Sequence, residues 1–198
     1  IGSLGLALAQ QIWIGITFPV RPTRLRADIC REEAFDESYS DLWQSVAGQF
    51  GASLVRDRAA LQARFGAKLE RYRLLACRRD KELLGYCIVK MKSFSNDGRM
   101  GNMKVGTIVD CLYDPRQPAV LQSLLAEAVQ CFRQEGMHAI FCTASLKAIR
   151  HVLVRNGFFK IPGNLNFAYH VRSPLSLEGT PLEAWHLMRG DSDADQNF

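Results

Sequence analysis

The chain has 198 residues, of which 47% are apolar and 23% are charged. These fractions exclude a disordered chain, and they suit one domain, or one and a fraction, with a substantial core. The net charge of +5 comes without a dense basic run. This balance argues against nucleic-acid binding and suits an anionic ligand such as a nucleotide or coenzyme A, or simply a solvated basic surface.

The six cysteines indicate a reducing compartment. None belongs to a CxxC pair, and most stand inside apolar runs. We therefore expect buried free thiols and a cytoplasmic protein. We predict no metal site, because the four histidines lack ligand spacing to one another and to the cysteines.

The first 30 residues differ from the rest. Residues 1–20 carry no charge, although glycine, glutamine and proline interrupt them, and residues 18–28 (FPVRPTRLRAD) contain two prolines and three arginines. A membrane span with basic flanks is one interpretation, but a linker or the tail of a preceding domain is favoured. We therefore assign residues 1–30 to a linker or tail and residues 31–198 to one domain, and we do not expect membrane association.

Two helices are predicted at the start of this domain. Asp36 can cap the first, and Asp57 opens the second. The apolar period then changes to that of strands. Residues 71–79 and 83–92 form a predicted hairpin, in which Gly85 suggests a bulge.

A long strand and a helix follow the hairpin. Residues 93–103 have the composition of a loop, and Lys104–Tyr113 is the next predicted strand, with the apolar run VGTIVDCLY. Pro118 suits the first turn of a helix that stops at Gly136. Residues 138–143 are then predicted as a buried strand.

The last elements are shorter. Ser145 can cap a helix that ends at Gly157 with a Schellman closure. Two final strands are predicted near residues 166–172 and 183–189. The tail, residues 190–198, has alternating aspartates but lacks the glycine and closing glutamate of a calcium loop, so we expect a frayed, solvated tail.

This order of elements predicts an α/β (α+β) fold with a mixed central sheet and helices on both faces. A helical crossover joins the strand over residues 104–113 to the strand over residues 138–143. We therefore expect these two strands to be adjacent, parallel and splayed at their carboxyl ends.

The same order resembles the GNAT family of acyl-CoA N-acyltransferases. The hairpin RYRLLACRRDKELLGYCIVK resembles the family's second and third strands, including the interior glycine, and VGTIVDCLYDP resembles its fourth strand. RQPAVLQSLLAEAV resembles the pyrophosphate loop with its helix, and LVRNGFF resembles the glycine–phenylalanine turn. The resemblance covers about residues 33–172 and implies a GNAT-like sheet.

The resemblance also implies a cofactor, acetyl-CoA or another acyl-CoA, and an amine acceptor on a small molecule or a peptide. In such a site the pantetheine arm binds between the splayed strands, and the pyrophosphate lies at the start of the next helix. The cofactor-binding candidates are therefore Val109, Cys111, Leu112, Arg116, Gln117, Ala119, Val120 and Leu121.

The family's loop pattern, Arg or Gln, two residues, Gly, one residue, then Gly or Ala, is half present. Arg116 matches, but Ala119 and Leu121 stand at the two small positions, and Pro118 removes an amide donor. The segment also fits an ordinary strand-to-helix turn. We therefore expect weak or absent acetyl-CoA binding by this chain alone.

Candidate groups for proton transfer are few. Asp110 is the best base candidate, because a carboxylate inside an apolar strand can become a better proton acceptor; the alternative is an outward-facing strand residue. The family's tyrosine and asparagine on the last helix are replaced by Leu153 and Leu146. Cys111 lacks an adjacent histidine, so a structural thiol is favoured over a nucleophile.

Two functions therefore compete. One is an acyl-CoA-dependent N-acyltransferase with a degraded pyrophosphate loop. The other is a non-catalytic GNAT-like half of a tandem protein, which serves substrate binding or structure beside an upstream GNAT-like domain. A homodimer would also be compatible with the sequence.

Overall fold

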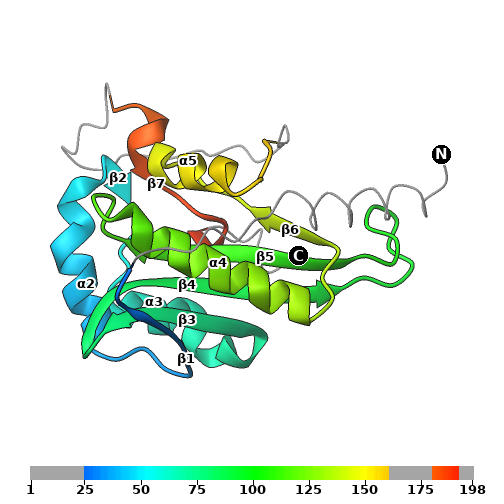
Figure 1. Cartoon of the computed structure of the whole chain (residues 1–198), viewed down its shortest axis with the longest axis horizontal. Helices are drawn as coiled ribbons and strands as arrows, with labels where there is room; N and C mark the ends of the chain where they lie inside the picture. Colours follow the sequence, from blue (N-terminus) through cyan, green and yellow to red (C-terminus); the bar gives the residue numbers. More distant parts are fainter. Residues whose placement is uncertain (1–24, 161–179, 192–198) are drawn as a thin grey trace.

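The computed structural model describes residues 25–160 and 180–191. At its centre is a five-stranded sheet with the order β1-β3-β4-β5-β6 (Figure 1). The strands are β1 (Asp28–Glu32), β3 (Tyr72–Arg79), β4 (Glu82–Ser93), β5 (Lys104–Tyr113) and β6 (Ala139–Cys142). Neighbours are antiparallel except β5 and β6, which are parallel. The predicted mixed sheet is therefore confirmed.

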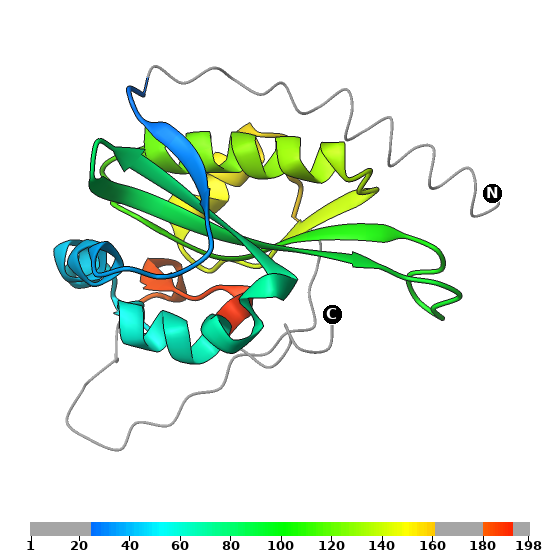
Figure 2. The same ribbon diagram turned by 90° about the horizontal axis from the view of Figure 1, so that it is seen from below.

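Helices cover both faces of this sheet (Figure 2). One face carries α4 (Pro118–Gln134) and α5 (Lys147–Arg155), and the other carries α2 (Ser38–Val46) and α3 (Arg58–Phe65). Short 3-10 helices are η1 (Ala47–Gln49), η2 (Gly66–Arg71), η3 (Leu182–Ala184) and η4 (Arg189–Asp191). A separate parallel pair joins β2 (Ala52–Ser53) to β7 (Trp185–His186).

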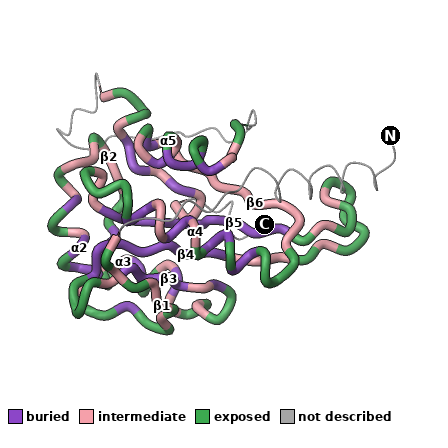
Figure 3. The backbone as a smooth tube through the Cα atoms, viewed as in Figure 1, coloured by how far each residue is buried: buried purple, intermediate pink, exposed green. Residues whose placement is uncertain are grey.

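Each face buries its own apolar cluster. The stripe of α4, with Leu121, Leu124 and Phe132, packs against one face of β3, β4 and β5. Tyr39 of α2 and Leu61 of α3 pack against the other face. Burial is therefore concentrated along β4, β5 and α4 (Figure 3), as expected for strands covered on both sides.

Two glycines let α4 lie close to the sheet. A Cβ on Gly106 would come within 2.5 Å of the Phe132 ring, and a Cβ on Gly85 would come within 2.7 Å of Val120. The β3–β4 register shifts between Cys77 and Arg78, directly beside Gly85. The bulge expected at this glycine is therefore confirmed.

The helix caps match the predictions in part. Asp57 caps α3, since its Oδ1 accepts a 2.8 Å bond from the Ala60 amide. Asp36 lies one residue before the N-cap of α2, although it accepts from the Ser38 amide at 3.0 Å. The N-cap of α5 is Leu146, not Ser145, because the Ser145 hydroxyl donates to the carbonyl of Trp185 at 2.6 Å instead.

The predicted Schellman closure of α5 is present. The amide of Phe158 donates to the carbonyl of Leu153 at 3.1 Å, and Gly157 has the required positive φ of 82°. Asn156 beside it forms a reciprocal amide pair with Gln122 of α4, with both bonds at 2.7 Å. The end of α5 is thus tied to α4.

The strand β1 begins before the domain boundary expected after residue 30. Asp28–Glu32 pairs antiparallel with β3 over its whole length, so residues 28–30 belong to the sheet. The strand was missed because three of its five residues are charged, as the sequence DICRE shows, and an edge strand tolerates such residues. Residues 1–24 lie outside the described residues.

The C-terminal part also differs from the prediction. Instead of a strand over residues 183–189, the structure has η3, the short β7 and η4. The strand expected near residues 166–172 lies outside the described residues. Across residues 25–160 and 180–191, no helix is long and apolar enough to cross a bilayer.

Candidate active site

β5 and β6 part near the middle of β5. Their pairing begins at Val105 and Ala139 and ends at Ile108 and Cys142. β6 ends there, whereas β5 continues to Tyr113. The backbone edge of β5 beyond Ile108 therefore runs past the end of its parallel neighbour. The predicted adjacency and parallel direction are confirmed, and the splay stays a prediction.

A β-bulge in β5 lies directly beyond the end of its pairing with β6. The β4–β5 register passes from Val89 opposite Ile108 to Ile88 opposite Asp110, so Val109 is the extra residue. Because of the bulge, Val109 and Asp110 face the same side, toward α2 and α3, whereas Ile108 faces α4.

Asp110 is fully buried on that side. Its Oδ1 accepts from Nε of Arg56 at 3.1 Å and from Nη2 at 2.9 Å, and its Oδ2 accepts from the Tyr86 hydroxyl at 2.9 Å. Asp110 is thus neither an outward-facing residue nor a free carboxylate. To accept a proton it would have to give up a buried ion pair.

Arg56 is the centre of this network and is itself fully buried. Burial alone would lower the pKa of Arg56, but the carboxylates of Asp110 and Asp191 raise it above its ordinary value. Its Nη1 donates to the Ser53 hydroxyl at 2.7 Å and to the carbonyl of Leu54 at 3.0 Å. Arg56 therefore carries a permanent, fully bonded positive charge.

Asp191 closes the network from the C-terminal end. Its Oδ2 lies 2.5 Å from Nη2 of Arg56, and its Oδ1 lies 2.7 Å from Nη1 of Arg64. Its side chain is only 4% exposed. The expectation of a solvated tail is therefore wrong at this residue, because two arginines hold Asp191 against the domain.

His186 lies beside this network. It is fully buried, and within residues 25–160 and 180–191 neither ring nitrogen has a well-formed hydrogen bond, although the backbone of Cys111 is close by. Burial and the nearby Arg56 charge lower the pKa of His186 to about 3. The ring packs against Phe50 with 4.8 Å between centroids. His186 is therefore neutral at pH 7 and retains both a donor and an acceptor for a polar group.

The candidate pyrophosphate turn lies between β5 and α4. Arg116 is 74% exposed and pairs with Asp114, with 2.8 Å between Nη2 and Oδ2. The hydrogen bonds to Arg116 lower the pKa of Asp114 to about 2. The amides of Arg116 and Gln117 donate to Asp114, and that of Val120 donates to Gln117. Most amides of the turn are thus committed within it.

The other cofactor candidates are placed differently. Gln117 and Ala119 are exposed at the start of α4. Val120 and Leu121 belong to α4 and are buried between this helix and the sheet, so the side chain of Leu121 points into the core rather than toward a phosphate. The remaining candidates, Val109, Cys111 and Leu112, are also buried. These three can meet a cofactor only through their backbone groups.

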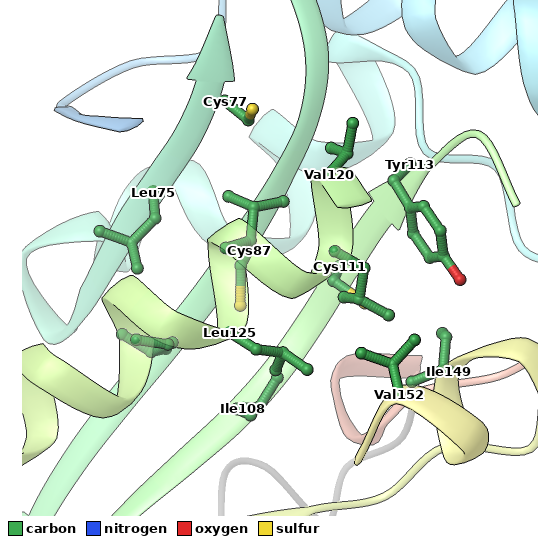
Figure 4. Packing of buried hydrophobic residues seen from close by; sticks show 14 of the residues in the cluster. Leu75, Cys77, Cys87, Ile108, Cys111, Tyr113, Val120, Leu125, Ile149 and Val152 are labelled. Atoms are coloured by element: carbon green, nitrogen blue, oxygen red, sulfur yellow. The ribbon is translucent and has the colours of Figure 1, made fainter. Parts of the chain in front are cut away.

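Tyr113 was not among the candidates, although it ends β5. Its buried hydroxyl has no hydrogen-bond partner in the part of the chain that the structure describes, and burial raises the pKa of Tyr113. Figure 4 shows its ring extending toward Ile149 and Val152 of α5. The phenol is therefore a polar group at the carboxyl end of β5 that a ligand could satisfy.

Sequence reasoning also missed Arg56, Asp191 and His186. Their partners are far away in the chain: Arg56 lies 54 residues before Asp110 and 135 residues before Asp191. No local period or motif marks such pairs. Within the described ranges, no group of three or more His, Cys, Asp or Glu side chains is arranged to hold a metal ion.

Comparison with protein-family models and with curated proteins gives no match. Several solved structures do match. A predicted acetyltransferase with acetyl-CoA from Clostridium acetobutylicum has a TM-score of 0.55 and 17% identity, with 72% of this chain and 96% of that chain covered. A GNAT family acetyltransferase from Staphylococcus aureus has a TM-score of 0.50 and 13% identity, with 73% and 100% covered.

An aminoglycoside acetyltransferase from an uncultured soil metagenomic sample, in complex with trehalose, also matches. Its TM-score is 0.50 at 13% identity, with 74% of this chain and 97% of that chain covered. At such identities the likeness concerns the fold. The chain therefore has the fold of the GNAT family of acetyltransferases.

Proposed function

We propose that the chain is an acyl-CoA-dependent N-acyltransferase. The observation that carries this proposal is the end of β6 opposite Ile108 of β5, beside the bulge at Val109. An extended thioester arm can pair with the backbone edge of β5 beyond the end of β6 in the way that an added strand does. The GNAT fold, including that of a neighbour solved with acetyl-CoA, supports this placement.

The start of α4 would hold the pyrophosphate. Helix N-termini attract anions through their amides and their dipole, and Arg116 is exposed at this point. The committed amides and Pro118 leave few donors, so we expect acyl-CoA to bind weakly. To bind a phosphate, Arg116 would have to break its ion pair with Asp114.

The transfer itself needs little from the side chains. The amine nitrogen forms a bond to the thioester carbon, the carbon–sulfur bond breaks, and the thiolate leaves. The nitrogen loses a proton and the thiolate takes one up. We keep Asp110 as the predicted base, which would have to release Arg56 in order to take up the proton.

That pairing favours a second candidate function. Because the Asp110 carboxylate is already paired with Arg56 and the pyrophosphate loop matches the family pattern only in part, the chain would be a non-catalytic GNAT-like unit that binds a substrate or supports an upstream domain. In either case the acceptor we propose is an amine on a small molecule or peptide, as the aminoglycoside acetyltransferase neighbour suggests. The free cysteines favour the cytoplasm.

Calorimetric titration with acetyl-CoA tests the proposal. We expect measurable but weak binding that Arg116→Ala weakens at least tenfold, because a charge-assisted contact contributes about 1.5–3 kcal/mol. Arg99→Ala, the same change in the exposed loop between β4 and β5, is the matched control and should bind as the parent does.

Transfer is measured in parallel as thiol release from acetyl-CoA with a panel of amines. Thiol release that depends on the amine would establish that the chain is an N-acyltransferase. Failure to bind acetyl-CoA at millimolar concentration would overturn the acyltransferase proposal and leave the non-catalytic GNAT-like unit as the remaining candidate.

A further inference from the structure

We propose that Arg56 and Arg64 form the binding site for a carboxylate on the acceptor, and that Asp191 occupies this site in the free protein. The acceptor is then a small amine that also carries a carboxylate. This inference rests on the proposed acyltransferase function and names the chemical class of its second substrate.

The position of η4 is the first argument. A Cβ on Gly190 would come within 3.1 Å of Val109 Cγ1, 3.3 Å of the Val109 carbonyl oxygen and 2.9 Å of the Phe65 ring. η4 therefore lies directly on the bulge of β5, on the face opposite α4. Since Val109 follows the last residue of β5 paired with β6, Asp191 is held where an acceptor would approach a thioester between the strands.

The geometry of the two arginines is the second argument. Each oxygen of Asp191 meets a different guanidinium, Oδ2 at Arg56 and Oδ1 at Arg64. Arginine is suited to planar, hydrogen-bonded recognition of a carboxylate. Asp191 thus shows how a carboxylate fits between the two side chains.

The charge balance is the third argument. Arg56, Arg64, Asp110 and Asp191 together carry no net charge, because two cations face two anions. When Asp191 leaves, one positive charge is uncompensated beside Asp110. Arg56 stays paired with the buried Asp110, and Arg64 is 22% exposed, so water can solvate part of this charge. An incoming carboxylate would restore the full pairing.

His186 is an independent sign of a ligand on this face. Among the described residues, neither of its two buried ring nitrogens has a well-formed hydrogen bond, although Arg56, Asp191 and the backbone of Cys111 are all close enough to shift its pKa. Buried polar groups are almost always hydrogen-bonded in folded proteins. A polar acceptor held by the arginines would offer His186 the partner that it lacks.

A tethered carboxylate competes with a free one. Because Asp191 belongs to the same chain, its effective concentration at the two arginines is at least about millimolar. The parent protein should therefore bind small carboxylates weakly, and Asp191→Asn, which keeps the shape and removes the charge, should bind them at least tenfold more tightly.

The titration uses β-alanine, propionate as the carboxylate without the amine, and propylamine as the amine without the carboxylate. We expect Asp191→Asn to bind β-alanine and propionate more tightly than the parent does and to leave propylamine unchanged. Adding Arg64→Gln should abolish the gain. Glu183→Gln, which removes a carboxylate from the exposed pair with Arg150, should behave as the parent does.

A second measurement uses the parent protein alone. The Met188 amide donates to Asp191 Oδ2 at 2.8 Å, and the Asp191 amide donates to the Met188 carbonyl at 3.1 Å. Saturating propionate should displace Asp191 and speed hydrogen exchange at these two amides, whereas propylamine should not. This test remains decisive if Asp191→Asn does not fold.

Equal propionate affinities of parent and Asp191→Asn, or unchanged exchange at saturating propionate, would overturn the inference. Neither the titration nor the hydrogen-exchange measurement contains acyl-CoA. A failure of thiol release would therefore count against the acyltransferase alone, and acetyl-CoA binding without carboxylate binding would count against this inference alone.

Discussion

The charged side chains of Arg56 and Asp110 are both removed from water, and their mutual attraction offsets the cost of that desolvation. The pair is joined through several hydrogen bonds, and both side chains are fully buried. A buried ion pair adds little net stability compared with apolar residues, but removing one partner leaves an uncompensated charge. The network therefore affects the free energy of unfolding most when one of its members is replaced.

Asp110→Asn should lower the free energy of unfolding by about 3–5 kcal/mol, because it leaves Arg56 charged and short of an anion. Urea unfolding at pH 7 measures this loss. Arg150→Gln breaks an exposed pair with Glu183 and should cost less than about 1 kcal/mol. Similar small losses for both variants would show that Arg56 finds water or another partner.

His186 predicts a dependence of stability on pH. The folded protein keeps the imidazole neutral down to a pKa of about 3, whereas the unfolded chain takes up its proton below the ordinary value of 6.5. The unfolded state therefore binds more protons between these values. Stability should fall as the pH drops below about 6.5, by about 1.4 kcal/mol per pH unit from this residue.

Unfolding curves of the parent and of His186→Phe between about pH 4.5 and 6.5 measure this slope. The variant should show the shallower slope, because it has no imidazole to charge. His151→Gln changes an exposed histidine of α5 and serves as the control. If His186→Phe leaves the slope of stability against pH unchanged, the pH dependence comes from other groups.

At the scale of elements, the distance between α4 and the sheet is set by glycines on the strands. Gly106 lies under the ring of Phe132, and Gly85 lies under Val120. Close packing of this kind tolerates little added volume. The position of α4 matters for function because its first turn carries the candidate phosphate contacts.

Gly106→Ala should cost about 1–3 kcal/mol, because its methyl group would overlap the Phe132 ring. Adding Phe132→Leu makes room, so the double variant should lose less than the sum of the two single changes. Gly98→Ala has open space around it and should be nearly neutral. Additive losses in urea unfolding would contradict this account.

At the scale of the molecule, the sequence was most informative where structure follows from local pattern. The hairpin, the long strand β5 and the stripe of α4 were predicted because apolar period and turn residues act over short distances. The parallel β5–β6 pair followed from connection rules. The burial of Arg56 with Asp110 and Asp191 could not be predicted, because it depends on segments that meet only in the folded chain.

The edge strand β1 leads to a prediction for the whole domain. Two deletions, of residues 1–27 and of residues 1–32, differ only in β1. The longer deletion should give the lower melting temperature, because it removes the strand that pairs with β3 and exposes a new sheet edge. Equal melting temperatures would mean that β1 adds nothing to the stability of the sheet.

The cysteines of the central sheet offer a way to observe its motion. Cys87 and Cys111 face each other across β4 and β5, and Cys142 ends β6. Burial raises the pKa of all three thiols, and only an exposed thiolate reacts with an alkylating reagent. The alkylation rate of the buried Cys111 would therefore report the rare openings around β5, and a thioester bound beside the end of β6 should slow that reaction.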